Sequence, residues 1–510
     1  MNEVLDRPLS VPGIDGYNDF INQKIERLLE GENLRVLDLF SGCGGLSLGF
    51  SKAGYKVIAG IELDEEAAES HAINFHKDDP FFSQHARSRD IQVTDPEQLL
   101  KEIGLVGNPK AQVDVIIGGP PCQAFTRIGR AKLRETFSNQ HAFLKDPRSQ
   151  LYKQYLSYVK SLAPMAILME NVPDMLNYGG VNIAELVCDD LNELGFKCQY
   201  TLLNSAHYGV PQMRERMFLI AIHSSVNADI LFPAPTHFIE LPKGYHGSRN
   251  VALKYILSEE TTARHYTAPP EPTAALPGAY SASDALSDLP LLTEHLENKM
   301  KRGAKKLDTP LPYSRLPQNG YQTLMRNWPG LPVVNTVCSN VIRFLPRDYP
   351  IFERMEPGDQ YPEAIEVANI LLTQKIRKEE KARGKPISKR SKKYEKLLKE
   401  TIPPYDVSKF PNKWRKMEED QPSRTLMAHL GKDSYSHIHY DSNQARTISV
   451  REAARLQSFP DGFKFAGAMN AAFRQIGNAV PPLMATSIAE AIRFTIETGI
   501  RCYRKRNLNT

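Results

Sequence analysis

One cysteine follows two prolines directly after an apolar segment of the chain. Residues 118–126 read Gly-Gly-Pro-Pro-Cys-Gln-Ala-Phe-Thr and follow the apolar segment 113–117, which predicts a buried strand that ends in a loop. Proline fixes φ at about −65° and lacks a backbone donor, so the two prolines restrict where the side chain of Cys122 points. Ligands of open α/β sheets bind at such strand ends. Cys122 is therefore a candidate nucleophile, although free cysteines are more often small buried residues.

A second candidate site is the segment 38–46, which reads Asp-Leu-Phe-Ser-Gly-Cys-Gly-Gly-Leu between a predicted strand and a predicted helix. Glycines at such a turn let the backbone approach a ligand closely, and the first turn of the helix offers free N–H groups with a positive dipole. Glu62 ends the next predicted strand, 20 residues after Gly42. This spacing suits a carboxylate that bonds a ribose hydroxyl. Asp90, after a possible third strand, could contact an adenine amino group.

The same segment indicates the type of ligand. Its glycines stand at positions 42, 44 and 45 and do not form the Gly-x-Gly-x-x-Gly pattern of dinucleotide sites. The acidic side chain of Asp38 would also repel a pyrophosphate. A ligand with an amino group and no phosphate fits better, and S-adenosylmethionine (SAM) is such a ligand. The alternative is a plain glycine turn without a ligand.

The composition describes a chain of 510 residues with 24% charged and 41% hydrophobic residues, which is typical of a soluble protein of two or three domains. No apolar run reaches the ~18 residues that span a bilayer, and the first residues do not resemble a signal peptide. The six cysteines form no Cys-x-x-Cys pair, which disfavours a zinc site or a disulfide framework. We therefore expect an intracellular protein with no metal site and no membrane contact.

Positive charge is concentrated in one segment. Residues 373–400 hold twelve Lys or Arg and four Glu, a balance of +8, so the rest of the chain carries 5 − 8 = −3 of the net charge of +5. The segment is either a solvated charged stretch, partly helical or disordered, or a phosphate-binding face that adds affinity without sequence preference. Composition alone favours the first interpretation.

Short apolar runs alternate with amphipathic stretches between residues 34 and 222. The pattern predicts strands at 35–40, 56–63, 113–118, 166–170, 198–204 and 216–222, and helices at 46–53, 65–75, 150–162 and 183–194. Such alternation predicts an α/β fold with a Rossmann-like, doubly wound and mainly parallel sheet.

Frequent prolines and weak periodicity mark residues 233 to about 440 as a separate, loop-rich region. Helices are predicted again at 449–457 and 483–495. The predicted organisation is an N-terminal extension (1–33), the first part of a catalytic domain (34–232), a second domain (233–445) and a C-terminal segment that completes the catalytic domain (446–500).

Four further clusters complete a recognisable set. They are 170–172 (Glu-Asn-Val), 212–216 (Gln-Met-Arg-Glu-Arg), 451–461 (Arg-Glu-Ala-Ala-Arg-Leu-Gln-Ser-Phe-Pro-Asp) and 475–482 (Gln-Ile-Gly-Asn-Ala-Val-Pro-Pro). In this order, and with the Pro-Pro-Cys loop, the chain resembles the DNA (cytosine-5)-methyltransferase family of bacterial modification enzymes over about 34–222 and 446–492. The resemblance implies a SAM-dependent methyltransferase domain and a smaller, loop-rich target-recognition domain at 233–445. Residues 373–400 look like a basic insertion within it.

The resemblance also implies a mechanism and the residues that perform it. Cys122 would attack C6 of a cytosine flipped out of duplex DNA, because a stacked base cannot reach the thiol. Glu170 would hold the N3 and N4 edge of the base. Arg216 would contact cytosine O2, and Arg214 the nearby backbone or loop. The structural alternatives are a capping role for Glu170 and surface ion pairs for the arginines. Most of 451–461 is expected to pack as a helix on the core, with Gln457 a candidate for orienting the two domains.

The residues expected to contact SAM come from the glycine segment, the following strand ends and the resemblance. They are Asp38, Phe40, Gly42, Cys43, Gly44, Gly45, Leu46, Glu62, Leu63, Asp90, Ile91, Pro121 and Asn478. Phe40 would pack on the adenine ring or else belong to the core. Asn478 would bring the C-terminal segment back beside Phe40 and Gly45.

A basic, glycine-containing stretch follows Cys122 and extends to Arg148. The family keeps a mobile loop there, and we expect residues 126–148 to close over Cys122 on DNA. The sequence has Thr126 where the family more often has Ser, a change that keeps the hydroxyl group.

The sequence disfavours three alternatives to a DNA methyltransferase. An RNA cytosine-5 methyltransferase on the same scaffold is disfavoured because the Cys-Phe-Thr motif of those enzymes and its nearby tyrosines are absent. An inactive relative is disfavoured by the intact candidate residues, and an NAD-dependent dehydrogenase by the glycine spacing. The expected partners are duplex DNA and a separately encoded restriction endonuclease, for a monomer acting in the bacterial cytosol or nucleoid.

Overall fold

The structure of the chain is a computed structural model that describes residues 17–121, 150–177, 181–242, 245, 249–250, 252–253, 256, 263–297, 299–300 and 306–507. The chain divides into two compact units. The first unit comprises Met1–Tyr208, Glu215–Gly278 and Ala479–Thr510, and the second comprises Gly209–Arg214 and Ala279–Asn478. None of the helices in the described ranges combines the length and the apolar character needed to cross a membrane.

The first unit is built on a six-stranded sheet with the order β2-β1-β3-β4-β7-β5. Its strands are β1 Arg35–Leu39, β2 Lys56–Ile61, β3 Val115–Gly118, β4 Ala166–Asn171, β5 Phe196–Asn204 and β7 Glu215–His223. Strands β2, β1, β3 and β4 pair in parallel, whereas β7 runs antiparallel to β4 and to β5. The predicted α/β fold with a mainly parallel sheet is confirmed, with β7 as the one reversed strand.

Helices cover this sheet, as the buried strands require. Every residue of β3 is buried, as expected for a parallel strand covered on both faces. The helices of the first unit are α1 Tyr17–Leu29, α2 Gly45–Lys52, α3 Glu65–Phe75, α4 Phe82–His85, α5 Pro96–Glu102, α6 Pro109–Gln112, α9 Gln150–Leu162, α10 Ile183–Glu193 and α19 Pro482–Asn507, with short 3-10 turns η3 Pro173–Asn177, η4 Ser205–Tyr208 and η5 Ser224–Val226. The four helices predicted between residues 46 and 194 match α2, α3, α9 and α10 to within a residue or two.

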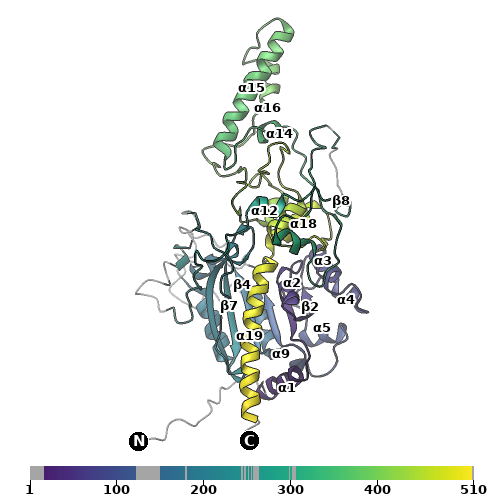
Figure 1. The fold of residues 1–510 in the computed structure, drawn as a ribbon, viewed down its shortest axis with the longest axis vertical. Coiled ribbons are helices and arrows are strands. Elements are labelled where there is room, and N and C mark those ends of the chain that lie inside the picture. Colours follow the sequence, from purple (N-terminus) through teal and green to yellow (C-terminus); the bar gives the residue numbers. More distant parts are fainter. Residues whose placement is uncertain are drawn as a thin grey trace. The chain divides into compact units, whose positions relative to one another are not determined.

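The last helix, α19, packs against α2, and Figure 1 shows it crossing the sheet region of the first unit. A Cβ placed on Gly49 of α2 would lie 2.4 Å from Ala485 Cβ and 2.6 Å from the backbone nitrogen of Thr486. Tyr55 donates its hydroxyl hydrogen to the carbonyl of Ala489 at 3.0 Å. This close packing joins the C-terminal segment to the glycine segment at the other end of the sequence.

The second unit consists of short elements joined by long loops. Its helices are α12 Ala282–Leu286, α13 Gly320–Arg326, α14 Tyr349–Phe352, α15 Tyr361–Arg383, α16 Lys392–Lys399, η6 Ala428–Gly431, α17 Val450–Leu456 and α18 Met469–Asn478, and its strand pairs are β6 Gln212–Met213 with β10 Ser423–Arg424 and β8 Leu311–Pro312 with β9 Thr336–Val337. Residues 446–478 pack with the second unit, whereas residues 479–507 pack with the first unit. The predicted boundary at 445, drawn from the resemblance, stays a prediction.

Residues of α17 form buried ion pairs and hydrogen bonds with other parts of the second unit. The guanidinium of Arg455 bonds the carboxylate of Asp461 at 2.7 Å and that of Asp288 at 3.1 Å, and all three side chains are fully buried. Arg451 donates to the carbonyls of Pro460 and Phe463. Gln457 accepts a hydrogen bond from Gln212 within the same unit. These contacts fit the structural role expected for most of 451–461.

We predict that Gly49→Ala lowers the free energy of unfolding. The new methyl group would meet backbone of α19 at 2.6 Å, and such overpacking costs about 1–3 kcal/mol, more than the gain of about 1 kcal/mol from the better helix propensity of alanine. Gly278→Ala is the matched control, since a Cβ there meets no atom within 4 Å. Urea unfolding of both variants checks this, and equal stability of the two would contradict the packing of α19 on α2.

Candidate active site

The glycine segment between β1 and α2 turns sharply. Phe40, Gly42 and Gly44 have φ values of 61°, 54° and 101°. A positive φ is strained for a residue with a side chain, and such strain is often found at functional sites. A Cβ on Gly44 would lie 2.4 Å from the ring of Phe75, so only glycine fits there. The turn leaves Phe40 and Gly42 partly exposed.

Glu62 lies beside this turn, at the end of β2. Its Oε2 accepts a hydrogen bond from the backbone nitrogen of Gly42, and its Oε1 one from Asp64, both at 2.8 Å. Backbone N–H groups thus hold the carboxylate in a fixed position. Burial raises the pKa of Glu62. The next side chain, Leu63, is 67% exposed although it is large and apolar. The strand end thus offers an acceptor and an apolar surface side by side.

Asp90 lies beside Glu62, but not at a strand end. The expectation of a strand before it is wrong, because Asp90 sits in a turn after α4 and the third strand of the sheet is Val115–Gly118. The backbone nitrogen of Arg89 donates to the carbonyl of Glu62 at 2.7 Å, which holds the turn at the end of β2. Asp90 is partly exposed, whereas the neighbouring Ile91 is buried.

Asp38 lies behind the turn in a buried polar cluster. It is fully buried, and its Oδ2 accepts a hydrogen bond from Ser47 Oγ at 2.6 Å. Ser47 Oγ also lies 3.0 Å from His71 Nε2. Burial raises the pKa of Asp38 to about 7. Cys43 is fully buried as well, and burial raises the pKa of its thiol. Asp38 and Cys43 therefore belong to the buried interior beneath the glycine turn.

A carboxylate and a guanidinium meet at the ends of β4 and β7. Glu170 Oε1 lies 3.1 Å from Arg216 Nε, and each side chain is only 12–15% exposed. A Cβ on Gly119 would lie 2.8 Å from Glu170 Oε2. The next residue of β4, Asn171, donates to the carbonyl of Pro120 at 3.1 Å. Glu170 and Asn171 therefore hold the backbone that leads to Cys122.

Cys122 and the expected closing loop 126–148 lie outside the described residues. Pro121 is the last described residue before them and is exposed. The backbone direction at this point is set by the contacts of Gly119 and Pro120 with β4. The described backbone therefore ends at the strand edge that carries Glu170.

Arg214 and Asn478 belong to the second unit. Arg214 is 2% exposed, and its Nη1 donates to the carbonyl of Leu426 at 3.0 Å. Asn478 is exposed at the end of α18. The two residues that follow it belong to the first unit, where a Cβ on Gly45 would lie 2.3 Å from the carbonyl of Val480 and 3.0 Å from Ala479 Cβ. The C-terminal segment therefore does return to Gly45.

A cluster that the sequence analysis did not single out contains two histidines. Ligand atoms of His76, Asp79 and His85 lie within 4.8 Å of one another, the one such group in the described part of the chain. The rings of His76 and His85 stack with centroids 3.7 Å apart and planes 7° apart. Nitrogen lone pairs of stacked rings do not converge on one ion, as tetrahedral ligation requires. Burial lowers the pKa of His76 to about 3, so the stack is a neutral packed pair.

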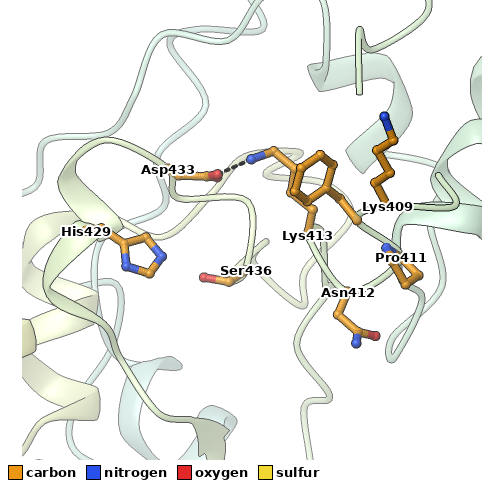
Figure 2. A pocket seen from close by; sticks show the side chains of 8 residues that line it. Lys409, Pro411, Asn412, Lys413, His429, Asp433 and Ser436 are labelled. Carbon is orange, nitrogen blue, oxygen red and sulfur yellow. Dashed lines mark hydrogen bonds and ion pairs between the residues drawn. The ribbon is translucent and has the colours of Figure 1, made fainter. Parts of the chain in front are cut away.

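The second unit contains a polar pocket of about 350 Å³. Figure 2 shows His429 and Ser436 on one side of it and Lys409, Pro411 and Asn412 on the other. The ammonium of Lys413 pairs with the carboxylate of Asp433. None of the site residues predicted from the sequence lines this pocket.

Comparison with known proteins identifies relatives along nearly the whole chain. Residues 34–493 match the family profile described as C-5 cytosine-specific DNA methylase. The chain is 41% identical over 467 residues to the putative type II methyltransferase M.OihORF3336P of Oceanobacillus iheyensis, covering 91% of this chain and 96% of that protein. It is 30% identical over 477 residues to the type II methyltransferase M.AgeI of Thalassovita gelatinovora, covering 91% and 100%.

A solved structure shares the fold. The crystal structure of a putative DNA modification methyltransferase encoded within an E. coli prophage is similar with a TM-score of 0.57 and 22% sequence identity, over 91% of this chain and 100% of that one. At this identity the likeness concerns the fold alone.

We predict that Asp38→Asn removes a pH-dependent loss of stability. Burial raises the pKa of Asp38 in the folded protein to about 7, so its favourable contribution is present in full below pH ~4 and is lost as the pH rises through ~7. The variant should gain stability over the parent between pH ~5 and ~8, by up to roughly 4 kcal/mol. Urea unfolding across this range measures the difference. A difference that does not change with pH would contradict a buried, protonated Asp38, and the exposed Asp229→Asn is the control.

Proposed function

The chain belongs to the C-5 cytosine-specific DNA methylase family, and we propose how its own residues perform the reaction of a DNA (cytosine-5)-methyltransferase. It methylates C5 of cytosine in DNA, an activity that its full-length relatives share as type II restriction–modification methyltransferases. The observation that carries the mechanism is the Glu170–Arg216 pair beside Gly119. It joins an acid, a cation and the start of the Pro-Pro-Cys loop at one strand edge.

The glycine segment fits SAM, the cofactor of this family. The carboxylate of Glu62 would accept hydrogen bonds from the ribose hydroxyls, and the exposed Leu63 together with Phe40 would cover the adenine ring. Gly42 and Gly44 turn the backbone so that it can approach the ligand, and Asp90 lies where an amino group could be bound. The partly exposed carboxylates of Glu62 and Asp90 would repel a phosphate, which suits a ligand that has none. SAM supplies a methyl group on a positively charged sulfur.

The chemistry starts at Cys122. Cytosine C5 is a poor nucleophile until a group adds at C6, and a thiolate can add there. Glu170 would donate a proton or a hydrogen bond to N3, so that the electrons arrive at C5 as an enamine. Arg216, 3.1 Å from Glu170, would fix the carboxylate and place positive charge near O2. After C5 has accepted the methyl group, its proton leaves to water and the Cys122–C6 bond breaks.

The target cytosine must leave the DNA helix to reach this edge of the sheet. Unstacking costs a few kcal/mol, which contacts to phosphates and closure of 126–148 would offset. Residues 233–445 would read the target sequence, and Arg214, anchored to Leu426, would hold the backbone between β6 and β7. We propose a monomer that acts on duplex DNA in the bacterial cytosol or nucleoid, with a restriction endonuclease encoded separately. The match to a DNA methylase family disfavours RNA as the substrate.

We predict that Cys122→Ala abolishes covalent capture of DNA. A duplex with 5-fluorocytosine at the target position should trap the parent enzyme in the presence of SAM, because fluorine cannot leave as the C5 proton does. The trapped complex survives denaturing electrophoresis. The Cys122→Ala variant should form none, and Cys502→Ser, which changes a partly exposed thiol on α19, should form it as the parent does. Capture by Cys122→Ala would exclude Cys122 as the nucleophile.

We predict that Glu170→Gln lowers kcat by about 10²–10⁴-fold and changes the KM for DNA much less. Glutamine keeps the shape of the side chain but cannot give N3 a proton. Single-turnover methyl transfer measures the chemical step directly. Glu193→Gln, an exposed residue at the end of α10, is the control. A loss confined to KM would contradict the role of Glu170 in the chemistry.

A further inference from the structure

The basic insertion is a helical hairpin within the second unit. Figure 1 shows α15 and α16 side by side beyond α14. The first turns of α15 pack into the core of the unit through Tyr361, Ala364 and Ala368. The outer part has a small core of its own, in which Leu372, Ile387 and Leu397 are buried. The hairpin therefore holds its outer end in a defined structure.

The outer end of this hairpin, residues 381–392, carries positive charge only. It contains six cationic side chains and no carboxylate, and all six side chains are exposed: Lys381, Arg383, Lys385, Lys389, Arg390 and Lys392. None of the six forms an ion pair within the described part of the chain. The cations that do pair lie further along α16, where Lys393 bonds Glu379 at 2.8 Å and Lys399 bonds Glu395 at 2.7 Å.

Folding of the hairpin does not account for this charge. Lys381 and Arg383 lie in the last turn of α15, where cations interact favourably with the helix dipole. Arg390 and Lys392 instead flank Ser391, the N-cap of α16, where the same dipole opposes positive charge. Six like charges within twelve residues also repel one another. A bound polyanion would offset both costs.

We propose that residues 381–392 form a phosphate-binding arm that contacts duplex DNA beside the target sequence. This inference rests on the proposed function, because DNA is then the polyanion that the enzyme already binds. Lysine and arginine at an exposed tip bind phosphates without reading bases. The arm would raise affinity for DNA and leave the choice of target sequence to other residues.

The length of α15 sets the reach of the arm. From Ala368 in the core to Arg383 there are 15 residues, or about 22 Å at 1.5 Å per residue. Successive phosphates of one strand are about 3.4 Å apart along the axis. The tip thus lies about 22 Å from Ala368 along the helix, a length equal to about six base pairs of duplex.

The test compares two variants of the full chain that lose equal charge. The arm variant is Lys385→Gln/Lys389→Gln/Arg390→Gln. The matched control is Lys56→Gln/Lys160→Gln/Arg504→Gln, three exposed cations of the first unit. Lys56 begins β2 and Lys160 precedes β4, so both lie away from the strand ends that carry Glu62 and Glu170. Fluorescence anisotropy with a 40-base-pair duplex of mixed sequence measures affinity between about 50 and 200 mM salt.

The arm variant should bind the duplex at least about tenfold more weakly than the parent, and its log–log salt slope should fall by about 2–3, at about 0.9 per lost phosphate contact. The matched control should keep the parental slope. An unchanged slope in the arm variant, or an equal loss in both variants, would overturn the proposal. Thermal unfolding confirms that the hairpin core remains intact. Because binding is read without methyl transfer, failure of this test is distinct from failure of the proposed reaction.

Discussion

The proposed chemistry depends on one close approach, between the carboxylate of Glu170 and the backbone of Gly119. Strands β3 and β4 are parallel neighbours, so their carboxyl ends meet at one edge of the sheet, where open α/β sheets bind ligands. A side chain at position 119 would collide with Glu170, and Asn171 bonds the carbonyl of Pro120. Glu170 and the backbone before Cys122, the proposed nucleophile, are thus held by the same strand.

The cofactor end depends on a contact between opposite ends of the chain. Gly45 starts α2, and Val480 lies against it more than 430 residues later in the sequence. Helix α19 then continues along α2, where Gly49 allows the two helices to touch. The C-terminal segment therefore packs against the start of α2, directly after the turn that carries Phe40 and Gly42. Most of the residues before it, Ala279–Asn478, belong to the second unit.

Local patterns predicted most strands and helices of the first unit, because short stretches of sequence show the periodicity of apolar strands and amphipathic helices. The 20-residue spacing from Gly42 to Glu62 indicated a carboxylate for a ribose hydroxyl, which stays a prediction, and the structure adds that Glu62 accepts from the backbone of Gly42. The reversed strand β7, the Glu170–Arg216 pair and the absence of a strand before Asp90 depend on tertiary packing and were not predictable in this way. For residues 373–400, composition alone did not distinguish a helix from a disordered segment. The structure shows a helical hairpin, in which Leu372, Ile387 and Leu397 are buried. The roles of Cys122 as the nucleophile and of residues 126–148 as a closing loop remain predictions.

We propose that this chain methylates C5 of one particular cytosine in duplex DNA. The most direct measurement incubates the protein with DNA and methyl-labelled SAM and then maps the product by bisulfite sequencing. We predict that the label is found at C5 of one cytosine within a fixed short sequence. Label in RNA alone, or on a nitrogen atom of a DNA base, would contradict it.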